Sequence, residues 1–155
     1  MAAVPSPYHQ LVLEHSRTPR RFGELAERTH AADGANPLCG DALHVELRVV
    51  DKRIVGYAFR GEACAITRAS ASMLGERLDN AGVNELAGIE AALHAVIERG
   101  VADDASLGEL NALAALEHYP SRRKCALLPL AVVGAALSGE GVVSTEENKI
   151  EEASQ

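Results

Sequence analysis

The sequence predicts an α+β domain in which a small antiparallel β-sheet of about three strands packs against four to five helices. Three features point to this fold class. Hydrophobic residues make up 47% of the 155 residues, which is enough to close a core, and Ala, Leu and Val dominate that share. One segment alternates between apolar and polar residues, as strands do. Several others repeat their apolar residues at helical spacing.

The strands are expected in the first half of the chain. Residues 42–50 alternate between apolar and polar side chains, and residues 54–59 return as a second strand. Asp51 and Lys52 stand between these two segments and are expected to form the turn of a hairpin. A further short strand is expected near residues 29–32.

The helices are expected from apolar spacing and from the residues at their ends. They cover residues 8–16, 65–78, 86–96, 107–116 and 121–137. The last of them follows Pro120, a residue that is favoured in the first turn of a helix.

The chain is expected to form one domain over residues 1–139, followed by an acidic tail over residues 140–155. The tail contains five Glu and one Lys without apolar periodicity, so it is expected to be disordered. The N-terminus lacks the basic start and apolar run of a secretory signal, and no apolar run is long enough for a membrane span. A cytoplasmic location is therefore expected, with no membrane partner.

The composition also argues against a nucleic-acid partner. Aromatic residues make up 3% of the chain and tryptophan is absent, although single-stranded nucleic acids are usually bound on aromatic side chains. The formal net charge is −7, which would repel a phosphate backbone.

Three cysteines are the residues most suited to chemistry. Their number is odd, so they cannot all pair in intramolecular disulfides, and in a reducing compartment such cysteines are often metal ligands, catalytic or buried. Each is expected at a junction: Cys39 before the first hairpin strand, Cys64 before a helix, and Cys125 near the start of the last helix. Helix N-termini and nearby cations stabilise thiolates, and Cys125 follows the basic residues 122–124.

Asp41 is a candidate fourth ligand. It lies two residues after Cys39, so on an extended backbone both side chains point to the same side. Three thiolates and one carboxylate suit a tetrahedral site for zinc, or for iron and sulfide. The spacing fits no general zinc signature, and two alternatives stay open: the cysteines could be small core residues, and Asp41 could cap the turn after Gly40.

Three motifs resemble those of a known family. The run Asn36-Pro37-Leu38-Cys39-Gly40-Asp41 resembles the N-P-x-C-G-D motif of the iron–sulfur scaffold family that includes IscU, SufU and the N-terminal domain of NifU. Residues 61–73 are similar to its second signature, G-x-x-C-x-I-S-x-A-S-A-S-M. Residues 122–126 are similar to its third, R-x-K-C-A. The match runs in order from about residue 8 to residue 137.

Other details resemble the SufU branch of this family. Residues 79–118 form a longer segment than in IscU-like members, Lys124 stands where those members place a histidine, and their L-P-P-V-K motif is missing. The resemblance implies a SufS-like cysteine desulfurase as partner, which offers persulfide sulfur. It also implies delivery to a downstream iron–sulfur scaffold or to apo-proteins.

The resemblance further implies a metal site. Its ligands would be Cys39, Asp41, Cys64 and Cys125, with zinc bound as in SufU-like members and an iron–sulfur cluster held transiently. Cys39 is the favoured sulfur acceptor, and Cys125 is the alternative because the last cysteine is implicated in IscU-like members. The basic run of Arg122, Arg123 and Lys124 is expected to tune Cys125 or to dock the partner.

The functional hypotheses differ in their chemistry. The chain is expected to be a zinc-dependent sulfurtransferase that accepts sulfur, or otherwise a non-enzymatic scaffold. The alternatives are a thiol redox protein and an inert zinc-stabilised interaction module. Among the histidines, His118 is the one to examine, because it lies seven residues before Cys125.

Overall fold

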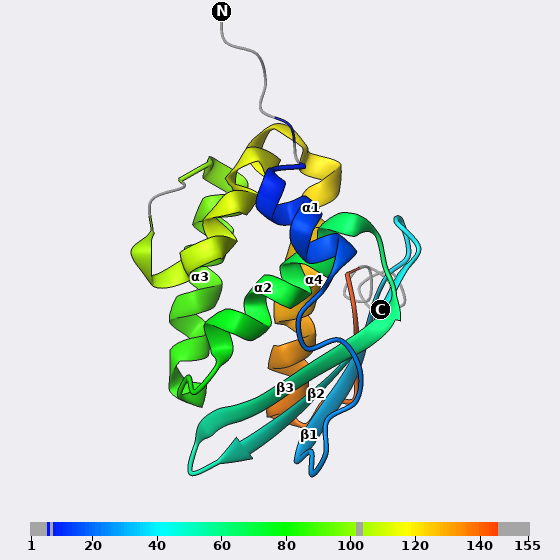
Figure 1. The fold of residues 1–155 in the computed structure, drawn as a ribbon, viewed down its shortest axis with the longest axis vertical. Coiled ribbons are helices and arrows are strands. Elements are labelled where there is room, and N and C mark those ends of the chain that lie inside the picture. The colour runs from blue at the N-terminus through cyan, green and yellow to red at the C-terminus, as the bar shows by residue number, and fades with distance from the viewer. Residues whose placement is uncertain (1–5, 7, 102–103, 146–155) are drawn as a thin grey trace, which may run out of the picture.

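A mixed β-sheet forms one side of the molecule, and helices gather against it (Figure 1). The computed structural model describes residues 6, 8–101 and 104–145, and within them the sheet has four strands in the order β3-β2-β1-β4. The strands are β1 (His30–Asn36), β2 (Asp41–Val50), β3 (Arg53–Glu62) and β4 (Val142–Ser144). The first three are antiparallel neighbours, whereas β4 runs parallel to β1.

The predicted hairpin is confirmed as β2 and β3. Asp51 and Lys52 join the two strands and have left-handed backbone angles, with φ of 51° and 62°. Two consecutive residues with positive φ give a tight turn whose twist matches that of the strands. The hairpin directs Asp41 at the start of β2, and the chain that follows β3, toward the same end of the sheet.

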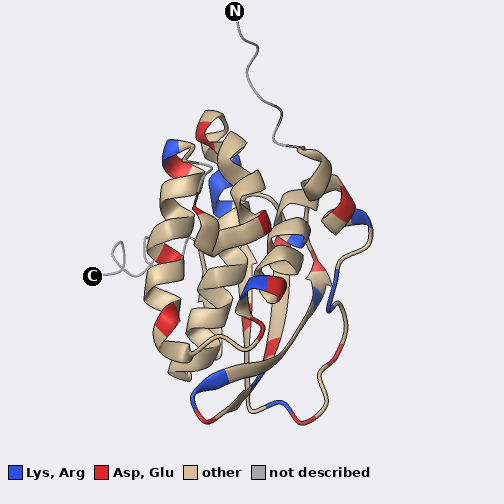
Figure 2. Cartoon of the chain, turned by 60° about the vertical axis from the view of Figure 1, so that its left-hand side comes forward, with Lys and Arg blue, Asp and Glu red and all other residues tan. Residues whose placement is uncertain are grey.

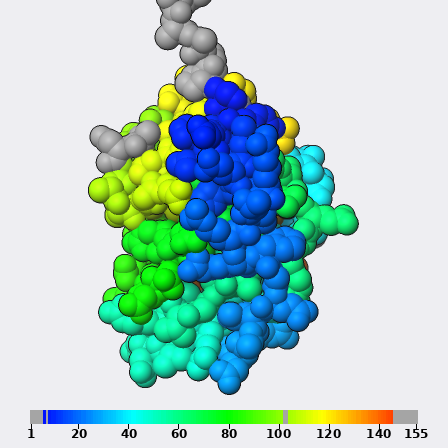
Figure 3. All heavy atoms as spheres, viewed as in Figure 1, coloured from blue at the N-terminus to red at the C-terminus, as the bar shows by residue number. Residues whose placement is uncertain are grey.

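Four α-helices and two 3₁₀ segments occur in the described ranges. They are α1 (Gln10–Arg17), α2 (Ala65–Leu78), η1 (Val83–Glu85), α3 (Leu86–Arg99), η2 (Ala105–His118) and α4 (Pro120–Ser138). α4 lies against β1 and β2, and α2 packs on both α4 and α1. Figure 3 shows α1 on the surface beside η2, with the segment after α1 running down the same face. The α+β class is confirmed.

η2 differs from the expected α-helix. The leucines of this segment recur at every third residue, at positions 107, 110, 113 and 116, and all four are buried. A period of three matches the 3₁₀ helix, which has three residues per turn, better than the α-helix with 3.6. The segment is also interrupted at Gly108, where φ is 55° and ψ is −127°. Its apolar face was therefore predicted from the sequence, but its type of helix was not.

The strand β4 corrects the prediction of a disordered tail from residue 140. β4 pairs with β1, and Val143 packs against the core, so the sheet continues past the expected boundary at residue 139. A strand of three residues is too short to show alternation, and acidic residues surround it in the sequence. The remaining part of the expected tail, residues 146–155, lies outside the described residues.

Charged positions are spread over both layers of the molecule. Figure 2 shows Lys and Arg positions interspersed with Asp and Glu positions on the helices and on the connecting segments. Such interspersion is typical of a solvated surface. Among the described residues, no helix combines the length and the apolar character needed to cross a bilayer.

The close approach of α4 to β1 depends on Gly34. A Cβ atom at this position would lie 2.3 Å from Cγ2 of Val132 and 3.2 Å from Cδ1 of Leu128, both on α4. It would also lie 3.3 Å from Cγ1 of Val143 on β4. Glycine in a strand often marks such a close approach. Because α4 carries Cys125, this contact helps to place the cysteine.

We expect Gly34→Ala to lower the free energy of unfolding by about 2 kcal/mol, because the added methyl group overfills the β1–α4 contact. The control is Gly88→Ala in α3, where a Cβ would meet no atom within 4 Å. That change should raise the free energy of unfolding by about 0.5–1 kcal/mol. Urea unfolding measures both values, and shifts of the same sign would contradict the packing described.

Candidate metal and sulfur site

Three segments that are distant in the sequence bring the cysteines together. Cys39 lies in the turn between β1 and β2, Cys64 precedes the first residue of α2, and Cys125 lies in the second turn of α4. The Sγ atoms of Cys39 and Cys125 are 3.1 Å apart. One ligand atom from each of Cys39, Asp41 and Cys125 lies within 4.8 Å of the other two. The junctions identified in the sequence therefore meet in one place.

Cys64 contacts this group from the side of α2. Its Sγ lies 4.0 Å from Oδ2 of Asp41 and 3.4 Å from the hydroxyl oxygen of Thr67. Its thiol also forms a hydrogen bond with Cys125. Cys64 thus borders the group through Asp41, although among the described residues the ligand atoms that lie within 4.8 Å of one another come only from Cys39, Asp41 and Cys125.

Asp41 joins the β1–β2 turn to the start of α2. Its Oδ1 accepts the backbone N–H of Cys64 at 2.7 Å, and its Oδ2 accepts the hydroxyl of Thr67 at 2.7 Å. The residue is only 3% exposed. These bonds reach across to another element, whereas the sequence left open that Asp41 caps its own turn. Thr67 was not singled out from the sequence, although it lies within the second motif.

Cys64 and Cys125 differ in proton affinity. The hydrogen bond from Cys125 lowers the pKa of Cys64 to about 6, and the Thr67 hydroxyl supports this shift while burial opposes it. The same hydrogen bond raises the pKa of Cys125, and burial adds to the effect. In the metal-free protein at neutral pH, Cys64 is therefore the thiolate and Cys125 keeps its proton.

A buried amide faces Cys125 from β1. Asn36 is 0% exposed, and its Nδ2 donates a hydrogen bond to Sγ of Cys125 at 3.5 Å. Asn36 was noted in the sequence as part of the first motif, without a role of its own. A buried polar side chain beside a cysteine is a signal that only the fold reveals, because 89 residues separate the two.

The three basic residues before Cys125 have different surroundings. The pKa of Arg122 is raised by Tyr8 and, to a smaller extent, by the three cysteines, so Arg122 lies on the side of the site. Arg123 instead donates to the backbone oxygens of Leu116 and Glu117 at the end of η2. Its contacts are thus structural. An open hollow of about 670 Å³ lies beside Cys39, and it is lined by Leu38, Cys39, Pro120, Ser121, Arg122 and Lys124.

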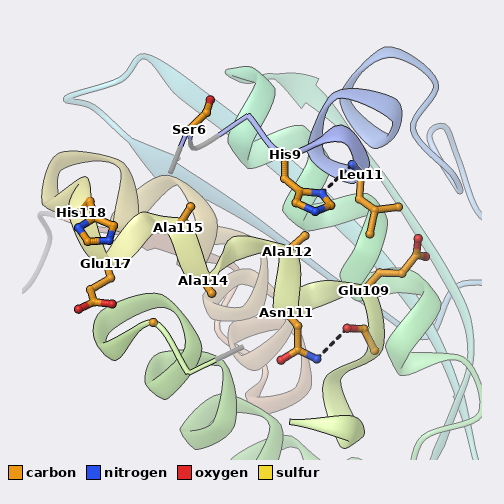
Figure 4. Close-up of a pocket in the computed structure, with 12 residues that line it drawn as sticks. Ser6, His9, Leu11, Glu109, Asn111, Ala112, Ala114, Ala115, Glu117 and His118 are labelled. Atoms are coloured by element: carbon orange, nitrogen blue, oxygen red, sulfur yellow. Dashed lines mark hydrogen bonds between the residues drawn. The ribbon is translucent and has the colours of Figure 1, made fainter. Parts of the chain in front are cut away.

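His118 belongs to a different part of the surface. It is exposed and lines a separate hollow between the start of α1 and η2, together with Glu117 and Ala115 (Figure 4). In the described part of the chain, the group of potential metal ligands contains no histidine. Although His118 is close to Cys125 in the sequence, it does not lie in the cysteine site.

Comparison with known proteins identifies the family. The family model of the NifU-like N-terminal domain matches residues 7–126, which is most of the chain and includes all four candidate ligands. This chain belongs to that family. The resemblance seen in the three motifs is confirmed, and the chain is grouped with iron–sulfur cluster assembly scaffold proteins of the IscU, SufU and NifU type.

Individual relatives cover nearly the whole NifU-like domain. Zinc-dependent sulfurtransferase SufU of Bacillus subtilis is 29% identical over 128 residues, which are 82% of this chain and 86% of the relative. Iron–sulfur cluster assembly scaffold protein IscU of Thermotoga maritima is 27% identical over 130 residues, with coverages of 84% and 92%. The crystal structure of a nitrogen-fixing NifU-like protein (N-terminal) from Brucella abortus matches with a TM-score of 0.78 at 24% identity, covering 86% of this chain and 93% of that one. It shares the fold.

The residues of this NifU-like domain fit a tetrahedral zinc site. At a zinc–sulfur distance of about 2.3 Å, two sulfurs on a tetrahedron lie about 3.8 Å apart. The sulfurs of Cys39 and Cys125 would have to separate only slightly from their 3.1 Å. Each oxygen of Asp41 keeps a lone pair beyond its hydrogen bond, and these bonds would orient the carboxylate as the outer partners of metal ligands do.

We expect Thr67→Val to lower the free energy of unfolding of the NifU-like domain by about 2 kcal/mol, because a buried carboxylate oxygen loses its donor. Thr67→Ser keeps the hydroxyl and should cost about 1 kcal/mol or less for the lost methyl group. Urea unfolding at neutral pH provides the comparison. Equal losses in the two variants would show that the hydroxyl does not hold Asp41.

The lowered pKa of Cys64 gives a prediction for its reactivity. In metal-free protein, the alkylation rate of Cys64 should rise as pH increases through about 6, since the thiolate is the nucleophile. An ordinary cysteine should show the same rise about two to three pH units higher. Mass spectrometry after short exposure to iodoacetamide measures the rate at each cysteine. A rise in the alkylation rate of Cys64 centred at pH 8 or above would contradict the lowered pKa of this thiol.

Proposed function

We propose that this chain accepts persulfide sulfur from a cysteine desulfurase at Cys39, and that it serves as a sulfur relay or as a scaffold for iron–sulfur clusters. The observation that carries the proposal is the convergence of three thiols and one carboxylate beside an open hollow. The cytoplasm suits such chemistry, because its reducing conditions keep thiols available.

Cys39 is the favoured acceptor because of its position. It lies in a turn, is partly exposed, and lines the hollow, whereas Cys125 is 0% exposed and faces the Asn36 amide. An incoming persulfide reaches Cys39 first. Cys125 is the alternative acceptor, since its sulfur lies 3.1 Å behind that of Cys39 and could receive the sulfur in a second step.

The transfer itself is a displacement at sulfur. The Cys39 thiolate attacks the terminal sulfur of the partner's cysteine persulfide, and a new S–S bond forms on Cys39. The S–S bond within the partner's persulfide breaks, and the partner's cysteine leaves as a thiolate. The step neither consumes nor releases electrons overall, so it needs no further oxidant or reductant.

Cys39, Asp41, Cys64 and Cys125 would hold zinc in the resting protein, and an iron–sulfur cluster would be a cargo of the same residues. Bound zinc would keep the thiols deprotonated while lowering their reactivity. Asp41 is the ligand suited to exchange, because a carboxylate is harder than a thiolate and is displaced from zinc more easily. Its bonds to Cys64 and Thr67 would retain it nearby.

The surface beside Cys39 suits a desulfurase segment that carries an acidic group. Leu38 is 75% exposed, which is unusual for a leucine, and provides an apolar contact next to the acceptor. Arg122 and Lys124 line the same hollow and provide positive charge on a chain whose net charge is −7. Opposite charges at an interface favour encounter and correct orientation.

The names of the relatives support the same function. The Bacillus subtilis relative is named a zinc-dependent sulfurtransferase, and the Thermotoga maritima relative is named a cluster assembly scaffold. A thiol redox protein is the second candidate, favoured by the short distance between the sulfurs of Cys39 and Cys125. An inert zinc-stabilised module is the third.

A sulfur-transfer assay separates these candidates. We expect the wild-type protein, mixed with a SufS-like desulfurase and L-cysteine, to gain one sulfur atom on Cys39, as mapped by mass spectrometry of peptides. Cys39→Ser should lose this gain, while Ser121→Ala, which changes the same hollow without removing a sulfur, should keep it within about twofold.

Three outcomes would contradict the proposal. Loss of two hydrogens between Cys39 and Cys125, without gain of sulfur, would indicate the redox protein. Bound zinc without either change would indicate the inert module. Gain of sulfur in Cys39→Ser but not in Cys125→Ser, with both variants folded by circular dichroism, would move the acceptor to Cys125.

A further inference from the structure

The chain beyond the family match reaches the cysteine site. The match ends at residue 126, whereas Thr145 follows β4 near the end of the described residues. The backbone N–H of Thr145 donates to the oxygen of Ala35 on β1 at 3.0 Å. Its hydroxyl donates to Oδ1 of Asn36 at 3.1 Å. Thr145 is therefore bound to the residue whose amide faces Cys125.

The two ends of the Asn36 amide have different partners. Oδ1 accepts from Thr145, and Nδ2 donates to the sulfur of Cys125 at 3.5 Å. The side chain is fully buried, so no solvent competes for either end. By donating to Oδ1, the Thr145 hydroxyl anchors the oxygen end of the amide. This bond holds Asn36 in the orientation in which an N–H group faces the sulfur.

We propose that Thr145 is a positioning residue for Cys125, because it fixes the Asn36 amide with its N–H group toward the sulfur. The inference deepens the proposed function and rests on it, since it concerns Cys125 as a ligand of the same site. Hydrogen bonds to a coordinating group orient that group and adjust its binding to the metal. Here the donor to the sulfur is Asn36 of the first family motif, and the residue that holds Asn36, Thr145, follows a strand that the motifs do not contain.

The strand β4 brings Thr145 to the end of β1. It pairs with β1 over residues 33–35, and Val143 packs against the core next to Gly34. Directly after this strand, the backbone N–H of Thr145 is also bonded to Ala35, which limits the positions open to its hydroxyl. The two neighbouring sulfurs therefore differ. The sulfur of Cys125 is held by the buried Asn36 amide, whereas Cys39 lies in the β1–β2 turn and remains available to react.

The first test uses metal-free protein and measures the solvent exchange of the Asn36 side-chain amide protons. In ¹⁵N-labelled wild type and in Thr145→Ser, the Asn36 side-chain amide protons should exchange slowly with solvent. Thr145→Val has nearly the same shape without the donor, and exchange there should be at least about tenfold faster, because the amide is no longer fixed. Equal exchange in the three proteins would overturn the proposal.

The second test reads metal binding with Co²⁺ as the probe. Thr145→Val should bind Co²⁺ about tenfold more weakly and show weaker sulfur-to-cobalt charge-transfer absorption, as expected for the loss of an outer partner. Thr145→Ser should stay within about twofold of wild type. The control Thr18→Val removes a hydroxyl that bonds Glu14 on α1, and should change nothing at the site.

The outcomes separate this inference from the proposed function. Equal weakening in Thr145→Ser and Thr145→Val would overturn the positioning role, since only side-chain size would then matter. Unchanged Co²⁺ binding in Thr145→Val would also overturn it and would leave the metal site intact. If wild type binds no Co²⁺ while exchange still distinguishes Val from Ser, the metal site fails and the orienting role of Thr145 is supported.

Discussion

The carboxylate of Asp41 links the β1–β2 turn to the start of α2, and the geometry of the cysteine site depends on this link. The side chain of Cys64 does not cap the N-terminus of α2, and Asp41 from another element accepts the backbone N–H of Cys64. A negative charge at a helix N-terminus is favourable, and a buried carboxylate needs such partners. One residue thus fixes the distance between two cysteines while remaining close enough to act as a ligand.

The third cysteine, Cys125, is positioned by the packing of α4 rather than by a hydrogen bond. Gly34 allows α4 to lie close to β1, and this contact brings the buried Cys125 behind Cys39. The resulting site is asymmetric. Its inner side is fixed by helices and by a buried amide, and its outer side is a turn beside an open hollow. An asymmetric site of this kind can retain a metal on one side while it receives sulfur on the other.

Periodicity and junctions in the sequence were sufficient for much of this arrangement. The alternation in residues 42–50 predicted the hairpin, and the placement of the cysteines at element ends, together with the resemblance of the three motifs, predicted their convergence. The 3₁₀ character of η2 was not predicted, because leucines at every third residue also fit one face of an α-helix. The strand β4 was not predicted, because a strand of three residues is too short to show alternation. The roles of Thr67 and Thr145 could not be predicted, because their bonds span 26 and 109 residues. Such contacts are set by the fold.

The ligand set is the centre of this account, and X-ray absorption spectroscopy of the zinc-loaded protein tests it most directly. The account predicts three sulfur neighbours at about 2.3 Å and one oxygen neighbour at about 2.0–2.2 Å. Replacement of Asp41 by Ala should remove or exchange the oxygen neighbour and leave the three sulfurs. A first shell with fewer than three sulfurs, or with nitrogen from histidine, would contradict a site made of Cys39, Asp41, Cys64 and Cys125.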